Sequence, residues 1–173
     1  AAANPLALAQ PVWTLGAVAR SIMLVGALES AVEQAVRYAG ERVQFGKPIG
    51  KNQAIQQNLA LMAGDVAAAR TAALVAAADA PDSLARDTAA THFSTAVAKV
   101  RAGEAATRGT SIAHQVHGAI GFTHEHSLHF ATKRLWAWRE EFGTDAHWAA
   151  ELGRAAIRAR AAGFWPGITH KQF

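Results

Sequence analysis

The chain leaves its first long helical stretch at residues 41–49, which read Glu41-Arg42-Val43-Gln44-Phe45-Gly46-Lys47-Pro48-Ile49. Gly46 and Pro48 interrupt the helical pattern, so this segment predicts a turn. A second interruption follows at residues 114–122, which read His114-Gln115-Val116-His117-Gly118-Ala119-Ile120-Gly121-Phe122. Glycines at such a place commonly end a helix. Each segment therefore puts an amide, a glycine and a ring or guanidinium at the end of a helix.

Apolar residues on both sides of the first turn have the spacing of core-facing helices. We expect one helix from about Leu15 to Arg42, and a second from a cap at Asn52 to about Asp79. The predicted buried stripes are Leu15, Val18, Ile22, Val25, Val32 and Val36 in the first helix, and Ile55, Leu59, Met62, Val66, Ala69 and Ala73 in the second.

The rest of the chain also predicts helices joined by short connections. Pro81 breaks the chain, and Asp82 or Ser83 is a suitable cap for a helix from Leu84 to about His117. Two further helices are expected at 128–138 and 145–162, with a turn at 142–144. Short connections imply antiparallel neighbours, so the expected fold is all-α, an antiparallel up-down helical bundle. It would form one domain over residues 1–173, with irregular tails at about 1–12 and 164–173.

The composition limits which ligands and partners the chain can be expected to bind. A chain of 173 residues suits one domain, and the lack of Cys excludes disulfides, thiolate nucleophiles and Cys-ligated metals. The formal charge of +4 and the pI near 10.0 favour anionic partners such as cofactor phosphates. The basic residues are scattered and no nucleic-acid-binding module occurs, so we expect no nucleic-acid partner.

The location is expected to be cytoplasmic, with no membrane segment. No charged flank precedes an apolar run at the start of the chain, and charges are expected to interrupt the apolar stretches before they reach a membrane-spanning length. The chain starts with Ala instead of Met, which predicts a processed or truncated polypeptide.

The two turns hold the residues best suited to bind a ligand. Arg42 has a planar fork of donors that fits phosphate oxygens, and Phe45 can stack on a ring system. Gln115 precedes Gly118, where a ligand could come close to the backbone. The alternative for each is structural: Arg42 solvates a helix end, Phe45 plugs the bundle, and the glycine only stops the helix.

Histidines and tryptophans near the end of the chain carry weaker signals. His124, Glu125, His126 and His129 are crowded together, but they lack the spacing of a zinc protease motif, and no further ligand is identifiable. We interpret them as hydrogen-bonded turn residues and expect no metal site. Trp136 and Trp138 predict a packed aromatic layer in preference to a platform for nucleic-acid bases.

Taken together, the motifs resemble the C-terminal helical domain of acyl-CoA dehydrogenases. The resemblance covers the chain from about Leu15 to Ala162. It rests on the order and spacing of Arg42-x-x-Phe45-Gly46, Asn52-Gln53-Ala54-Ile55, Gln115-x-x-Gly118-x-x-Gly121-Phe122, Glu125 and Gly143-Thr144.

The resemblance implies an edge of an FAD site. In that family two protomers pack through this domain, and its motifs reach the FAD of the neighbouring protomer. Arg42 would contact the pyrophosphate, and Phe45 would pack near the adenosine half. The remaining cofactor contacts implied by the family are Gln53, Gln115, Gly118 and Thr144, with Thr144 close to the flavin.

The residues that depart from the family pattern concern the catalytic base. Many members carry a Glu directly before the Gly-Thr pair, where this chain has Phe142, which cannot accept a proton. Other members carry the Glu on the first helix, where this chain has Gly16, beside Ala17 in place of a common substrate-contacting Arg. Glu141 is the remaining candidate catalytic base, one residue from the expected position.

The family resemblance leaves three hypotheses for function. The first is the C-terminal domain of an FAD-dependent acyl-CoA dehydrogenase-like oxidoreductase, which desaturates an acyl-CoA thioester. The acyl-CoA substrate would bind through N-terminal helical and middle β-domains that are absent from this chain. The second is a non-catalytic partner subunit in a homo- or hetero-oligomer of such protomers. The third is an unrelated helical interaction module.

Overall fold

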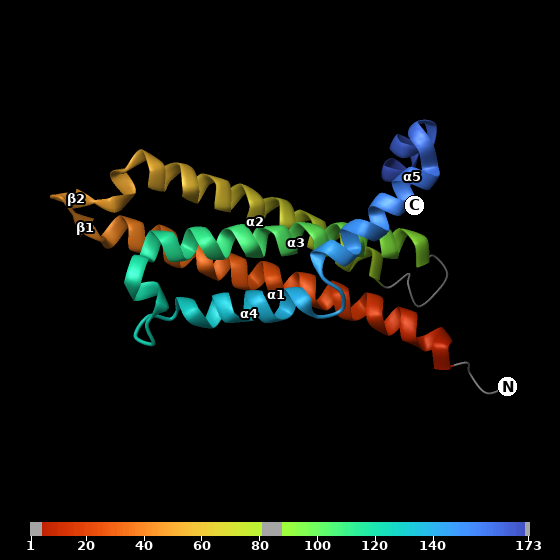
Figure 1. Cartoon of the computed structure of the whole chain (residues 1–173), viewed down its shortest axis with the longest axis horizontal. Helices are drawn as coiled ribbons and strands as arrows, with labels where there is room; N and C mark the ends of the chain where they lie inside the picture. Colours follow the sequence, from red (N-terminus) through yellow and green to blue (C-terminus); the bar gives the residue numbers. More distant parts are fainter. Residues whose placement is uncertain (1–4, 81–87, 172–173) are drawn as a thin grey trace.

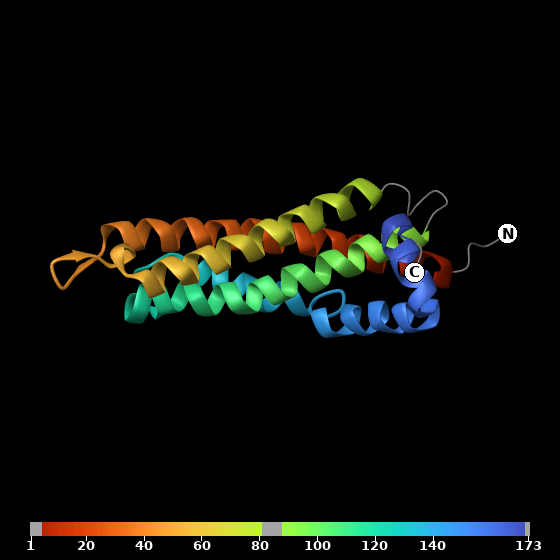
Figure 2. The same ribbon diagram turned by 90° about the horizontal axis from the view of Figure 1, so that it is seen from above.

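The computed structural model describes residues 5–80 and 88–171, and it confirms the predicted all-α, up-down bundle. Figure 1 shows the bundle helices lying side by side, and Figure 2 shows the same arrangement from above. The bundle helices are α1 (Pro5–Glu41), α2 (Gln53–Asp79), α3 (Thr88–His117) and α4 (Leu128–Glu140). The last helix, α5 (Asp145–His170), runs along α3 and turns across the end of the bundle.

Local signals place the start of α2 and the end of α3 where the sequence predicts them. After α1 the chain forms a hairpin of two short strands, β1 (Val43–Gln44) and β2 (Lys47–Pro48), and then a short 3₁₀ turn, η1 (Ile49–Lys51). The predicted cap at Asn52 is confirmed, because its side-chain oxygen accepts a hydrogen bond from the amide of Ala54 at 3.1 Å. Gly118 ends α3 with a φ of 64° and begins η3 (Gly118–Phe122).

Several boundaries differ from the sequence prediction. We expected irregular tails at 1–12 and 164–173, but α1 begins at Pro5 and α5 continues to His170. Within α5, Arg160 has a φ of 56°, so the helix bends there and the segment after it folds back. The predicted cap at Asp82 or Ser83, and the expected start of its helix at Leu84, lie outside the described residues.

Alanine shares the buried face of α1 with larger aliphatic residues. The predicted stripe is right at Val18 and Val25, which are buried, but wrong at Ile22 and Val36, which are 46% and 51% exposed. The small residues let α1 lie close to its neighbours, so alanine occupies the contact. The buried alanines of α1 are Ala17, Ala31, Ala35 and Ala39.

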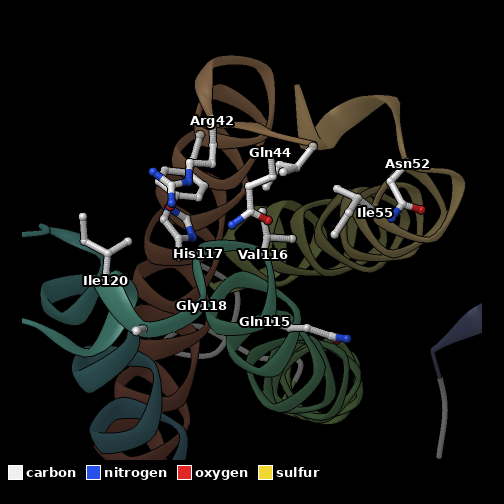
Figure 3. A pocket seen from close by; sticks show the side chains of 12 residues that line it. Arg42, Gln44, Asn52, Ile55, Gln115, Val116, His117, Gly118 and Ile120 are labelled. Carbon is white, nitrogen blue, oxygen red and sulfur yellow. The ribbon is translucent and has the colours of Figure 1, made fainter. Parts of the chain in front are cut away.

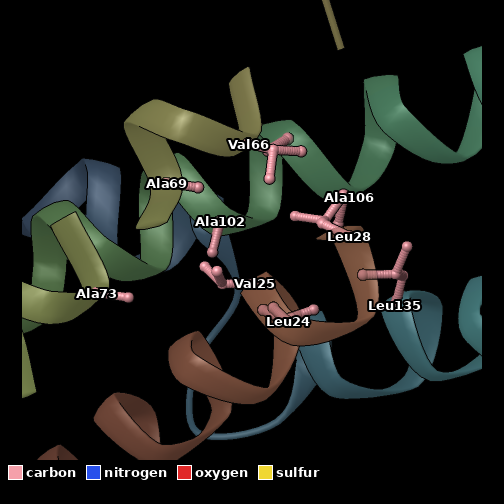
Figure 4. Packing of buried hydrophobic residues seen from close by; sticks show 10 residues of the cluster. Leu24, Val25, Leu28, Val66, Ala69, Ala73, Ala102, Ala106 and Leu135 are labelled. Carbon is pink, nitrogen blue, oxygen red and sulfur yellow. The ribbon is translucent and has the colours of Figure 1, made fainter. Parts of the chain in front are cut away.

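A smaller set of large side chains fills the middle of the bundle. Leu24, Leu28 and Leu135 are fully buried, and Val66 reaches the same cluster from α2 (Figure 4). Alanines of α2 and α3 lie between them, among them Ala69, Ala73, Ala102 and Ala106.

Two of the helices are apolar over a membrane-spanning length. Both Pro11–Glu41 and Gln53–Asp79 have the length and composition to cross a membrane, contrary to our expectation that charges would interrupt every apolar stretch. A core helix passes the same test of length and composition, but only 39% and 28% of the two apolar windows are buried in the bundle.

The ring of Phe142, in the turn between α4 and α5, packs against α1 in the space left by the missing side chain of Gly16, a gap that we call the notch. A methyl group added at Gly16 would lie 2.4 Å from the ring of Phe142, so the ring occupies the space a side chain would need. The edge of Trp13 packs on the same ring with centroids 5.8 Å apart. Phe142 itself has a φ of 54°, a conformation that costs a bulky residue energy and that these contacts help to hold.

Exchange of Gly16 for alanine tests this contact. We expect Gly16→Ala to lower the free energy of unfolding by about 1–3 kcal/mol, because the new methyl group overlaps the Phe142 ring. The matched control is Gly26→Ala in the same helix, where an added methyl group has no neighbour within 4 Å. That control should gain about 0.5–1 kcal/mol from helix propensity. Denaturant unfolding measures the free energy of unfolding of both variants. If the two substitutions stabilised the protein equally, the close packing of Phe142 on Gly16 would be refuted.

Candidate functional site

An open pocket lies at the end of the bundle where α1 stops, α2 starts and α3 stops (Figure 3). Its volume is about 510 Å³. We call it the Arg42 pocket. Its lining residues are Tyr38, Arg42, Gln44, Ile49, Asn52, Ile55, Gln115, Val116, His117, Gly118, Ala119 and Ile120.

Arg42 gives the pocket its positive charge. Its backbone is fixed, since its amide donates to the Tyr38 carbonyl at 2.8 Å and its carbonyl accepts from the amide of Ile49 at 2.9 Å. The Arg42 side chain is exposed, and within the described part of the chain it forms no ion pair with a carboxylate. No Asp or Glu is among the described residues that line the pocket, so the site favours an anion.

Three of the residues predicted to contact a cofactor meet in this pocket. Arg42 comes from the end of α1, while Gln115 and Gly118 come from the end of α3 (Figure 3). A side chain at Gly118 would meet no atom within 4 Å, so the backbone faces open space, and its φ of 64° favours glycine. The folding of the bundle therefore joins two segments that are far apart in the sequence.

The other two predicted contacts at this end lie beside the pocket. Phe45 is at the tip of the β1–β2 hairpin, where it is 99% exposed and is not among the lining residues. Gln53 begins α2 next to the lining residue Asn52, and its side chain is exposed. Neither side chain plugs the bundle, which was the structural alternative for Phe45.

Thr144 and Glu141 lie at a second place, in the turn between α4 and α5. The Thr144 hydroxyl oxygen accepts a hydrogen bond from the His147 amide at 3.0 Å and so caps α5. Glu141 forms an ion pair with Arg20 of α1, in which its Oε2 lies 2.5 Å from Nη2 and 2.6 Å from Nε. The structure does not bring these two residues to the Arg42 pocket.

A buried lysine fixes this second turn. Lys99 of α3 donates hydrogen bonds from Nζ to the carbonyls of Arg139 at 3.1 Å and Glu141 at 2.8 Å. Trp148 donates from Nε1 to the Phe142 carbonyl at 2.9 Å. Burial lowers the pKa of Lys99 to about 8, against the opposing pull of nearby carboxylates. The turn before Thr144 is thus held through its backbone.

Two ring residues of the Arg42 pocket were missed as site residues. His117 is 3% exposed and stacks on Tyr38, with ring centroids 4.6 Å apart and planes 25° apart. Burial lowers the pKa of His117, and the nearby His126, His114 and Arg37 oppose its positive charge further. The position of His117 directly before the helix-ending glycine could have marked it as a site residue. Its stacking on Tyr38 could not be predicted, because it depends on how α1 and α3 pack together.

The crowded histidines form aromatic and hydrogen-bonded contacts. His129 uses Nδ1 in a 2.7 Å hydrogen bond with the carbonyl of His126, and His126 Nδ1 accepts from the amide of Leu128 at 3.1 Å. Within residues 5–80 and 88–171, no group of three or more His, Asp or Glu residues is placed to hold a metal ion. His126 and His129 therefore stabilise the turn between η3 and α4.

Comparison with known proteins relates this geometry to one family. The profile of the acyl-CoA dehydrogenase C-terminal domain matches residues 7–157. The Mycobacterium tuberculosis acyl-CoA dehydrogenase IpdE2 is 37% identical over 110 residues, which cover 64% of this chain and 31% of that protein.

Solved structures agree with the sequence match. Butyryl-CoA dehydrogenase from Megasphaera elsdenii superposes with a TM-score of 0.78 at 29% identity, covering 87% of this chain and 38% of that chain. The ChsE4–ChsE5 complex from Mycobacterium tuberculosis gives a TM-score of 0.78 at 27% identity, covering 86% and 39%. This chain therefore spans about a third of the relatives it matches, and it belongs to the acyl-CoA dehydrogenase family as a C-terminal domain.

Proposed function

We propose that this chain is the C-terminal domain of an FAD-dependent acyl-CoA dehydrogenase-like oxidoreductase and contributes one edge of an FAD site across a protomer interface. The assembled protein would desaturate an acyl-CoA thioester between its α and β carbons. The observation that carries the proposal is the meeting of Arg42, Gln115 and Gly118 in one open pocket that no carboxylate lines among the described residues.

The chemistry of the Arg42 pocket fits the phosphate portion of such a cofactor. FAD, when bound, accepts the hydride that leaves the substrate. In this chain, the guanidinium of Arg42 would hold the pyrophosphate through charge-assisted hydrogen bonds. Gln115 adds an exposed amide, and the backbone at Gly118 is open to close approach.

The hairpin supports a contact across an interface. Phe45 is almost fully exposed, and Figure 1 shows the β1–β2 hairpin projecting beyond the end of the bundle. A ring at the tip of a projecting hairpin lies away from its own core and does not pack there. It is free to pack on another protomer. We therefore assign Phe45 to the adenosine half of a cofactor bound mainly by the neighbour, and place Gln53 beside it.

Replacement of Arg42 tests the cofactor assignment. Arg42→Ala in the assembled protein should retain FAD about 10- to 100-fold less tightly, because a charged hydrogen-bonding partner of the pyrophosphate is lost. Arg134→Ala, an exposed arginine on α4 outside the pocket, is the control and should retain FAD normally. Cofactor release followed by flavin absorbance measures both; full retention of FAD by Arg42→Ala would refute the assignment.

A second candidate function, that of a non-catalytic partner subunit, is favoured by the α4–α5 turn. The family resemblance puts the base either at Phe142 or at Gly16, and here the Phe142 ring fills the notch at Gly16. The neighbouring carboxylate, that of Glu141, is engaged by Arg20. Such a subunit would complete the FAD site of an active protomer, with Thr144 near the flavin, and leave proton removal to that protomer.

Acyl-CoA-dependent bleaching of the flavin separates the two candidates. A partner subunit purified alone should give no bleaching, and activity should appear when a catalytic protomer is added. Robust bleaching by the protein alone would exclude the partner role. In that case Glu141→Gln should lower the rate by about 10²- to 10⁴-fold if Glu141 is the base, and an unchanged rate would exclude it.

A further inference from the structure

His117 carries a buried acceptor that no hydrogen bond satisfies. Its Nδ1 lies 2.7 Å from the Ala113 carbonyl, and because a carbonyl only accepts, Nδ1 carries the proton. The neutral ring therefore has its lone pair on Nε2, which is buried and has no hydrogen-bond partner among the described residues. A buried acceptor left in this state costs free energy, and a ligand that donates a hydrogen bond to it would recover that cost.

The surroundings of His117 fix both its orientation and its charge. Tyr38 of α1 stacks on one face of the ring, and the His126 ring lies edge-on with centroids 4.5 Å apart. The other titratable or charged groups facing it are Arg37 of α1 and His114 of α3, and Arg42 of α1 shares the pocket. All of these are basic except Tyr38, so they disfavour a second proton on His117 and keep Nε2 an acceptor near neutral pH.

Arg42 and His117 offer complementary groups to one ligand. Figure 3 shows both side chains on the same side of the pocket, Arg42 from the end of α1 and His117 from the end of α3. Arg42 can only donate, and neutral Nε2 can only accept. The Arg42 side chain is exposed and long, so it can turn toward an anion in the pocket that the His117 ring also lines.

We propose that His117 Nε2 accepts a hydrogen bond from a sugar hydroxyl next to the phosphate bound by Arg42, so that the pocket selects a ribose or ribityl phosphate over a bare phosphate. This inference rests on the proposed function and names the part of the cofactor that the pocket recognises. It makes His117 a specificity-determining residue of the site.

Two probes, one that carries a ribose and a base and one that carries neither, test the inference. ADP carries ribose hydroxyls beside its pyrophosphate, whereas inorganic pyrophosphate has none. In the assembled, cofactor-stripped protein, His117→Phe keeps a ring to stack on Tyr38 but lacks the acceptor. It should weaken ADP binding about three- to tenfold, the size of one neutral hydrogen bond, and leave pyrophosphate binding unchanged. Titration calorimetry at pH 7.5 measures both.

Three further variants make the result specific. His117→Gln retains an acceptor and should recover part of the ADP affinity, which a packing defect alone would not allow. Arg42→Ala should weaken both probes. His124→Phe, an exposed histidine outside the pocket lining, should change neither.

The pH dependence gives an independent test of the acceptor. Protonation of His117 converts Nε2 to a donor, so the ratio of wild-type to His117→Phe affinity for ADP should fall toward one as the pH is lowered from 7.5 to 5.5. A ratio that grows as the pH falls would overturn the inference, because it would mean that a charged imidazolium binds the phosphate instead.

The outcomes separate this inference from the function on which it rests. If wild type binds neither ADP nor pyrophosphate, the proposed FAD edge fails. If Arg42→Ala loses both probes while His117→Phe binds ADP as wild type does, the FAD edge stands and the role of His117 is refuted.

Discussion

Close contact between helices at positions that carry small side chains is the constraint on which the structure depends. On α3, a methyl group added at Gly109 would come within 2.9 Å of the Leu28 side chain, and one added at Gly103 within 2.6 Å of the Asp145 side chain. Buried alanines such as Ala35 and Ala113 continue the same close contact toward the hairpin end of the bundle. Because α1 and α3 pack this closely, their ends meet, and the Arg42 pocket forms between them.

The same constraint explains what could be predicted from the sequence. Helix ends depend on local chemistry, so the Asn52 cap and the glycine stop at Gly118 were both predictable. The buried face of α1 was predictable only in part: Val18 and Val25 are buried as expected, but Ile22 and Val36 are exposed, because an alanine-rich helix has no strong apolar stripe. Family motifs predicted cofactor contacts at Arg42, Gln115 and Gly118, which line one pocket. The buried acceptor of His117 was not predictable, because it depends on which helices lie against it.

The geometry also separates the Arg42 pocket from the turn that carries the predicted base. The Arg42 pocket lies at the hairpin end, with a guanidinium that pairs with no carboxylate of the described residues, an exposed amide and open backbone. The turn at residues 141–144 lies between α4 and α5, where Phe142 fills the notch at Gly16, Arg20 holds Glu141, and Lys99 fixes the backbone. The first place is arranged to bind an anion, whereas the second is arranged to be rigid and filled. Under the proposed function, the first place would hold the cofactor, and the second would not itself remove a proton.

The most direct test of the account is an experimental structure of the assembled flavoprotein, in which the distance from the Arg42 guanidinium to the FAD pyrophosphate is measured. The account predicts a hydrogen-bonding distance to a cofactor whose flavin ring is held by a different protomer. A structure in which other residues neutralise the pyrophosphate while Arg42 faces solvent, or in which one protomer encloses the whole cofactor, would contradict it.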